Sequence, residues 1–141
     1  MQQPIVISGA GILGCYISCA LSLQGIDSIV LEKKDDEVED SVRTITLNPF
    51  SKNLLDKIGI ENDYSMINKM EVKDFDGTGK IVFKSSEIGM DHLAYVSDFA
   101  TLLMAVRKKA SEKILYKEEI IDIDNKGDLN EVTLSLSLIH I

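Results

Sequence analysis

Three glycines near the N-terminus have the spacing of a loop that holds the phosphates of a dinucleotide. Gly9, Gly11 and Gly14 form a Gly-x-Gly-x-x-Gly pattern. Its first glycine permits a tight turn, its second lets the backbone approach a pyrophosphate, and its third lets helix and strand pack closely. Glu32 follows roughly 20 residues later, where a carboxylate accepts hydrogen bonds from a ribose diol. We expect a dinucleotide site, and the alternative is a glycine turn kept only for tight packing.

The residues around this pattern predict the elements that would position it. Residues 4–8 are short, apolar and β-branched, which indicates a strand buried on both faces. Residues 12–24 are apolar or small and predict a buried helix that stops at Gly25. Residues 28–32 predict a second strand that ends in an acid. Together they form one βαβ unit, whose strands are parallel and whose crossover is right-handed.

The rest of the chain predicts further helices and strands and one change of periodicity. We expect helices over 49–58 and, with Asp98 as its N-cap, from 98 to 110. Alternating apolar residues in 70–83 flank a glycine-bearing turn at 76–79 and predict a β-hairpin. Further strands are expected over 114–124 and 132–138. The predicted fold class is α/β, a Rossmann-like βαβ domain with an inserted antiparallel β-hairpin.

Composition excludes several classes of protein. The chain has 141 residues, which fits one domain, and a net charge of −8 from 23 acidic and 15 basic residues. This charge argues against a nucleic-acid partner and against docking on anionic lipid by charge alone. Two cysteines, Cys15 and Cys19, exclude a disulfide scaffold, so we expect a cytoplasmic protein. The apolar run 12–23 is too short to span a bilayer, and we expect no targeting segment.

Two other clusters of reactive side chains have simpler interpretations. Cys15 and Cys19 lie four residues apart on one helix face, but a metal pair would need more ligands nearby. We therefore expect buried structural cysteines and no metal site. The acidic residues within 35–40 lack the spacing of a calcium loop and indicate a solvated loop. From the residues alone we name no catalytic residue.

Three downstream stretches carry a resemblance to a known family. Residues 40–48, the hairpin at 70–77 and residues 94–99 accompany the glycine pattern. Together they resemble the N-terminal part of the class A FAD-dependent aromatic monooxygenases, most closely the branch that hydroxylates ubiquinone precursors. In that branch an Arg-x-x-x-Leu stretch, here 43–47, follows the glycine pattern, and a similar hairpin supplies substrate-domain strands. The resemblance covers almost all of residues 4–135.

The resemblance implies FAD as the cofactor, NAD(P)H as co-substrate and O2-dependent hydroxylation of a small aromatic or quinone-precursor substrate. The glycines would hold the pyrophosphate, Glu32 the adenosine ribose, and the backbone of Ile120 the adenine. Arg43 would lie near the phosphates, and its alternative role is a surface partner for the acids at 35–40. Many relatives have an arginine or glutamine where this chain has Ser97 or Asp98, so Asp98 is best interpreted as a cap. The implied cofactor-binding residues are Gly9, Ala10, Gly11, Ile12, Leu13, Gly14, Glu32, Lys33, Arg43 and Ile120.

The resemblance also sets expectations for the domain boundaries. Residues 1–135 would form the N-terminal part of the FAD-binding domain, with a substrate-domain insertion at about 64–96. The family's second flavin motif, a Gly-Asp pair, would lie beyond this chain, so we expect the fragment to be inactive alone. Residues 136–141 are also the translation of a common sequencing adapter; we expect a non-native tail, with a genuine strand as the alternative.

Three further readings stay open. One alternative function is an NAD-linked or other flavin oxidoreductase. Another is a non-catalytic nucleotide-binding fragment. For the full-length protein, peripheral membrane or multi-enzyme association is a further expectation.

Overall fold

The computed structural model describes residues 3–39, 42–127, 129–135 and 138–140. The chain divides into two compact units. The first unit comprises Met1–Asp40 and Leu102–Ile141, and the second comprises Ser41–Thr101. The glycine pattern and Glu32 both belong to the first unit.

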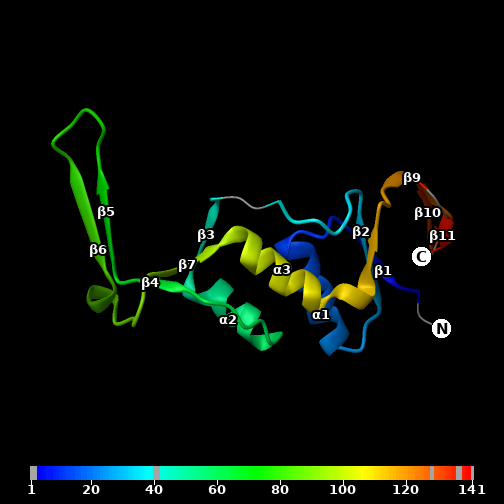
Figure 1. Ribbon diagram of the computed structural model, residues 1–141, viewed down its shortest axis with the longest axis horizontal. Helices are drawn as coiled ribbons and strands as arrows, with labels where there is room; N and C mark the ends of the chain where they lie inside the picture. Colours follow the sequence, from blue (N-terminus) through cyan, green and yellow to red (C-terminus); the bar gives the residue numbers. More distant parts are fainter. Residues whose placement is uncertain (1–2, 40–41, 128, 136–137, 141) are drawn as a thin grey trace. The chain divides into compact units, whose positions relative to one another are not determined.

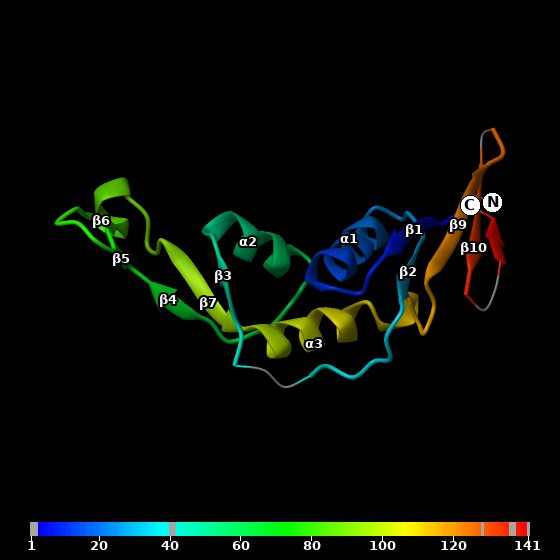
Figure 2. The same cartoon turned by 90° about the horizontal axis from the view of Figure 1, so that it is seen from above.

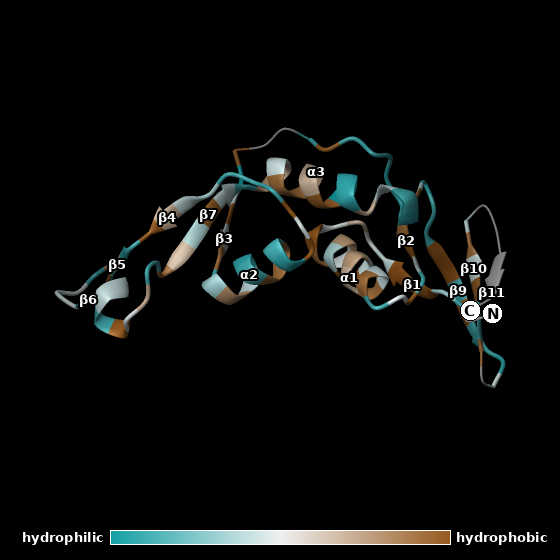
Figure 3. Cartoon of the chain, turned by 90° about the horizontal axis from the view of Figure 1, so that it is seen from below, coloured by the Kyte–Doolittle hydropathy of each residue, from teal (hydrophilic) through white to brown (hydrophobic). Residues whose placement is uncertain are grey.

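The first unit contains a parallel sheet built around the predicted strand–helix–strand segment. β1 (Ile5–Ser8) and β2 (Ser28–Glu32) pair in parallel, and α1 (Ile12–Leu23) connects them and packs on both (Figure 1). β8 (Ile114–Tyr116) pairs in parallel with the other side of β2, so β2 is the central strand. β1 is brown in Figure 3, as expected for a strand rich in Ile and Val. The expected burial of this first strand on both faces is wrong, because β1 pairs only with β2 among the described residues and Ile5 is 44% exposed.

α1 ends where the sequence predicts and is buried on one face. Gly25 has φ +72°, and its N–H donates to the carbonyl of Ser22, while the N–H of Ile26 donates to that of Leu21. These two bonds form the Schellman motif that commonly closes a helix. Ser18 packs against the sheet through a 2.9 Å hydrogen bond between its Oγ and the Oγ of Ser28. The predicted buried helix is therefore buried on one face only, and other side chains, such as Leu13 and Leu23, are exposed.

A second sheet of the first unit is antiparallel. It contains β9 (Ile120–Asn125), β10 (Asn130–Leu134) and β11 (Leu138–His140), with β10 in the centre (Figure 2). Val132 and Leu134 of β10 pack with Leu31 of β2, and Ile120 packs against this cluster. The hydrophobic contact therefore joins the two sheets of the unit.

Two of the predicted strands differ from the observed ones. The single strand expected over 114–124 is wrong, because Lys117 has φ +61° and separates β8 from β9. The strand expected over 132–138 ends at Leu134, after which the N–H of Ser135 donates to the carbonyl of Glu119. Of the expected non-native tail, residues 136–137 and 141 lie outside the described residues.

The second unit has its own antiparallel sheet and contains the helix α2. β3 (Thr44–Leu47), β7 (Ala94–Asp98) and β4 (Ser65–Ile67) lie side by side in that order. α2 (Pro49–Lys57) follows β3 and confirms the predicted helix. Its start is fixed by Pro49 in the first turn and by Asn48, whose Oδ1 accepts a 2.7 Å hydrogen bond from the N–H of Ser51.

Two more strands of the second unit form an antiparallel pair. β5 (Lys69–Lys73) and β6 (Lys80–Lys84) pair from Lys69 with Lys84 to Lys73 with Lys80, and the short helix η1 (Ser85–Ile88) follows. The connection runs over residues 74–79, so the expected turn at 76–79 is too short. A 3.0 Å bond from the N–H of Asp74 to the carbonyl of Gly79 closes the loop. Phe75, expected in a strand, is 98% exposed in this loop.

α3 (Phe99–Lys109) begins at the predicted cap and precedes the short helix η2 (Ser111–Lys113). Oδ1 of Asp98 accepts a 2.7 Å hydrogen bond from the N–H of Thr101, which confirms Asp98 as an N-cap. One face of α3 is apolar, and Leu102, Leu103 and Val106 on this face are buried. Within the described part of the chain, every helix is too short or too polar to cross a bilayer.

Candidate dinucleotide site

The first turn of the glycine pattern is fixed to the end of β2. Gly9 has φ +98°, a backbone conformation in which a residue with a Cβ atom is strained. Its N–H donates a 2.7 Å hydrogen bond to the carbonyl of Leu31. The chain therefore leaves β1 and turns towards α1 directly beside the last residues of β2.

Gly14 allows α1 to approach this turn. A Cβ atom at position 14 would lie 2.1 Å from the carbonyl oxygen of Gly9 and 3.4 Å from Cγ2 of Ile7. The first distance is far below any van der Waals contact, and the atom it involves belongs to the backbone. The third glycine of the pattern thus does the packing task that its spacing predicts.

Gly11 does not serve packing within the chain. It has ordinary extended backbone angles, φ −77° and ψ 179°, and a Cβ atom there would have nothing within 4 Å. It is the N-cap of α1 but has no side chain to accept hydrogen bonds from the first turn, which also carries no acidic residue. The N–H groups of this turn and the positive end of the helix dipole are therefore open to an anion such as a pyrophosphate.

Glu32 is the last residue of β2 and completes the site. Its Oε2 accepts a 3.0 Å hydrogen bond from the N–H of Ala10, and its Oε1 accepts one of 3.1 Å from the N–H of Lys34. The side chain is 13% exposed. A carboxylate has about four acceptor positions, so Glu32 retains capacity for hydroxyl donors of a ribose.

Arg107 of α3 is a part of the site that the sequence analysis did not find. Its Nε donates a 2.9 Å hydrogen bond to the carbonyl of Ala10, and its Nη2 lies 3.5 Å from Oε2 of Glu32. Arg107 begins a run of three basic residues, which favours interpretation as a solvated helix end. The available signal was its spacing, since it follows the buried Leu103 by one helical turn.

The nearest thiol to the glycine turn is unreactive. Cys15, directly after Gly14, is wholly buried, and burial raises its pKa to about 11, although the positive charge of Arg107 opposes this shift. Burial also raises the pKa of the Cys19 thiol. Both cysteines are free and buried, as the sequence predicts. Neither thiol is suited to act as a nucleophile.

The other predicted cofactor residues occupy varied surroundings. Ile12 is half-buried, Leu13 is 68% exposed, and Lys33 is exposed beside Glu32. Ile120 packs against the hydrophobic cluster of the first unit. Arg43 is exposed in the second unit, where its guanidinium lies 4.3 Å from the centre of the Phe99 ring. Its expected place near the phosphates stays a prediction.

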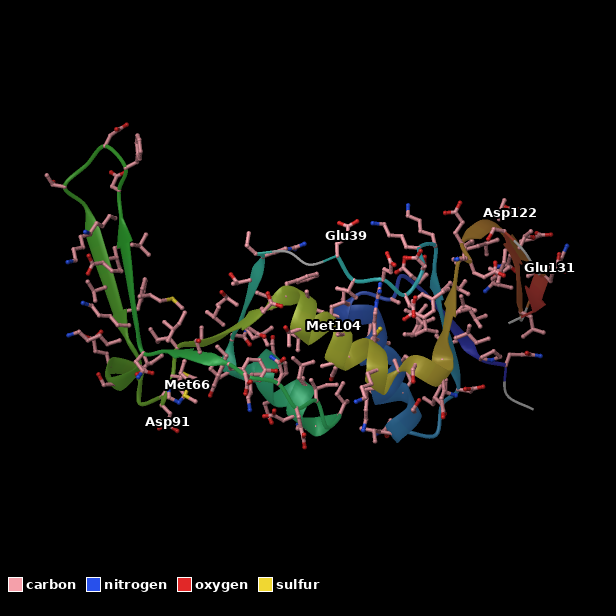
Figure 4. All side chains as sticks on the ribbon, in the orientation of Figure 1. Glu39, Met66, Asp91, Met104, Asp122 and Glu131 are labelled. Atoms are coloured by element: carbon pink, nitrogen blue, oxygen red, sulfur yellow. The ribbon has the colours of Figure 1, made fainter. Side chains whose placement is uncertain are left out.

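The acidic loop after β2 behaves as a solvated segment over its described residues. Asp35, Asp36 and Glu37 are exposed, and the side chain of Glu39 points away from the ribbon (Figure 4). Asp40, the last member of the acidic run, lies outside the described residues.

The glycine turn, the open helix end and the terminal acid together suit the ADP half of a dinucleotide. A comparison with known protein families identifies the dinucleotide. The model of a family described as "FAD binding domain" matches residues 2–127. The chain belongs to this family. FAD is therefore its cofactor, and the prediction made from the sequence is confirmed at this level.

Solved structures with the same fold include a monooxygenase, a complex with FAD and a Diels-Alderase. The p-nitrophenol 4-monooxygenase PnpA from Pseudomonas putida DLL-E4 superposes with a TM-score of 0.77 at 15% identity, over 98% of this chain and 38% of its own. HpxO from Klebsiella pneumoniae, in complex with FAD and uric acid, superposes with a TM-score of 0.75 at 18% identity, over 98% of this chain and 37% of its own. The Diels-Alderase PyrE3 of pyrroindomycin biosynthesis superposes with a TM-score of 0.77 at 20% identity, over 99% of this chain and 31% of its own.

These matches concern the fold, and the chain spans less than two fifths of the length of these structures. The expected FAD-binding domain is confirmed by the family match, and the relation to flavin monooxygenases stays a prediction. The ubiquinone branch stays a prediction.

Proposed function

We propose that the chain is the N-terminal, FAD-binding portion of an NAD(P)H- and O2-dependent hydroxylase that acts on an aromatic ring, with a ubiquinone precursor as the substrate. Membership of the FAD-binding family supports the cofactor. The fold shared with a p-nitrophenol 4-monooxygenase supports hydroxylation as the reaction. The resemblance carried by residues 43–47 and by the hairpin supports the ubiquinone-precursor class.

The difference between Gly11 and Gly14 is the observation that supports the placement of FAD at the glycine turn. Gly14 is required by the packing of α1 on Gly9, whereas Gly11 faces open space. A glycine without a packing role fits a backbone that a pyrophosphate approaches closely. In this placement the ribose hydroxyls donate to Glu32, and the neighbouring residues Ala10, Ile12, Leu13 and Lys33 surround the ADP portion.

The remaining assignments extend this placement along the chain. The backbone of Ile120 would contact the adenine, and Arg43 would offset the charge of the phosphates. Residues 64–96 would contribute to the substrate domain. The exposed apolar pair of Val72 and Ile81 across β5 and β6 supports this role, since a face of this kind suits packing or substrate contact.

The chain's own residues bind and orient the cofactor in this proposal. Bound FAD supplies the redox chemistry between NAD(P)H and O2. The N–H groups at the start of α1 hold the anionic pyrophosphate, and Glu32 selects a ribose with free hydroxyls. No side chain of the described residues is assigned a proton-transfer role.

Flavin retention tests the placement of FAD. The gene product is purified, and its flavin absorbance per protein and its dissociation constant for FAD are measured for wild type, Glu32→Ala and Gly11→Val. We expect both variants to bind FAD at least about tenfold more weakly, because each removes or blocks a direct contact. Gly79→Ala is the matched control, since its Cβ atom would meet only Asp74 Cβ at an ordinary 3.6 Å. Unchanged affinity in Glu32→Ala and Gly11→Val would contradict the placement.

Product analysis tests the reaction. The full-length gene product, loaded with FAD, is given NADH or NADPH and a phenolic quinone precursor under 18O2. The proposal predicts a hydroxylated product that carries one 18O atom. Oxidation of the nicotinamide without an oxygenated product would instead favour another flavin oxidoreductase. The shared fold with a Diels-Alderase keeps a reaction without hydroxylation as a specific alternative.

A further inference from the structure

Arg107 contacts both of the elements that would bind the ADP part of FAD. We propose that it is a positioning residue, which holds Glu32 and the glycine turn in the arrangement that recognises the adenosine ribose. This inference rests on the proposed placement of FAD at this site.

The contacts join segments that are distant in the sequence. Nε of Arg107 donates to the carbonyl of Ala10 at 2.9 Å, and Nη2 lies 3.5 Å from Oε2 of Glu32. The same Oε2 accepts the N–H of Ala10 at 3.0 Å. Ala10, Glu32 and Arg107 therefore form a closed triangle in which each member contacts the other two.

Burial shields this triangle from solvent. The side chains of Arg107 and Glu32 are 12% and 13% exposed, and Ala10 is wholly buried. Water therefore screens the two charges little. The guanidinium also lies 5.7 Å from the centre of the Tyr116 ring, and Tyr116 is the residue paired with Glu32 between β8 and β2. Four elements of the first unit, the glycine turn, β2, β8 and α3, thus converge on Arg107.

The planar guanidinium explains why arginine suits this position. Its donors are held in a rigid fork, so Nε and Nη2 fix the carbonyl of Ala10 and the carboxylate of Glu32 relative to each other. A lysine ammonium carries a similar charge but is a point donor on a flexible stem. Arg107 thereby sets the direction in which Glu32 presents its remaining acceptor positions to a ribose.

Two other roles are compatible with the same contacts and must be separated from positioning. Arg107 could serve only the stability of the first unit through its buried ion pair. It could also touch FAD directly, because Nη1 is buried and has no hydrogen-bond partner within the described part of the chain. Positioning differs from both because it acts through Glu32, so it must change the preference for a ligand that carries the ribose hydroxyls.

The experiment compares FAD with its 2′,3′-dideoxyadenosine analogue, which lacks the hydroxyls that Glu32 would bind. Dissociation constants for both ligands are measured by titration of the apo gene product. The variants are Arg107→Met, Arg107→Lys and Glu32→Gln, and Lys108→Met is the matched control because Lys108 is the exposed neighbour on α3. The melting temperature of each apoprotein is recorded alongside.

We expect wild type and Lys108→Met to bind FAD about tenfold more tightly than the analogue. This ratio corresponds to the free energy of a hydrogen bond to a charged group. Glu32→Gln and Arg107→Met should both lower this preference to about two- to threefold or less, and Arg107→Lys should lie between. If Arg107→Met does not fold, Arg107→Lys carries the test, with a preference reduced below that of wild type.

Two results would overturn the inference while leaving the FAD site intact. Wild-type preference in both Arg107 variants with a lower melting temperature would indicate a purely structural ion pair. Weaker binding of both ligands by the same factor would indicate direct contact with FAD. A wild type that binds neither ligand, or does not distinguish them, would instead overturn the proposed placement and this inference with it.

Discussion

The close approach of α1 to the glycine turn makes Gly14→Ala the sharpest test of the local structure. A Cβ atom would lie 2.1 Å from the carbonyl oxygen of Gly9, and the neighbouring atoms, Gly9 C at 3.3 Å and Ile7 Cγ2 at 3.4 Å, leave little room beside it. To reach an ordinary contact of 3.4 Å or more, the start of α1 must move at least about 1.3 Å from the turn. Overpacking of this kind costs about 1–3 kcal/mol.

The assay is thermal and urea unfolding of the apoprotein. At about 4 °C per kcal/mol for a domain of this size, we expect the melting temperature to fall by about 4–12 °C. Gly11→Ala is the matched control, because its Cβ atom would meet nothing within 4 Å and its backbone angles suit any residue. We expect its apoprotein to melt within about 2 °C of wild type. Equal melting temperatures for wild type and Gly14→Ala would refute the packing argument.

Two further predictions concern the cap of α3 and the buried thiols. Hydrogen bonds from Thr101 lower the pKa of the exposed Asp98 carboxyl. The contribution of the ionised carboxylate to the stability of the protein is therefore present above the unfolded pKa and is lost as the pH falls through the lower folded pKa. Asp98→Ala should therefore be less stable than wild type in urea unfolding at neutral pH. An equal difference in stability between the two proteins in strong acid would contradict the role of Asp98 as a cap. Cys15 and Cys19 should react with iodoacetamide at pH 8 far more slowly in the native protein than in urea, because both are buried and the pKa of Cys15 is about 11. Mass spectrometry measures both rates, and equal rates in the two states would show that the face of α1 that carries these cysteines is not buried in the native protein.

The elements around the glycine pattern could be predicted because local residue types determine them. Gly25 ends α1 in a left-handed conformation, and Asp98 and Asn48 cap the two later helices through their own side chains. The spacing of Gly9, Gly11 and Gly14 likewise indicated three different tasks, and the structure assigns packing to Gly14 and open space to Gly11.

The features that the sequence did not predict depend on tertiary contacts. Lys117 adopts φ +61° although lysine gives no local signal for it, and the N–H groups of Lys117 and Glu118 donate to the carbonyls of Lys34 and Glu32. These long-range bonds separate β8 from β9. Arg107 was missed for the same reason, since its partners Ala10 and Glu32 lie 97 and 75 residues away in the chain.

Hydrogen–deuterium exchange of the gene product with and without FAD tests the central claim most directly. The account predicts that saturating FAD slows exchange in the segment 9–14 and at residues 32–34, because the pyrophosphate and ribose would cover the N–H groups of the open helix end and the neighbourhood of Glu32. The exposed hairpin loop at 74–79 serves as an internal reference for segments away from the proposed site. Protection confined to other segments, or no change at 9–14 under saturating FAD, would contradict the placement of the cofactor at the glycine turn.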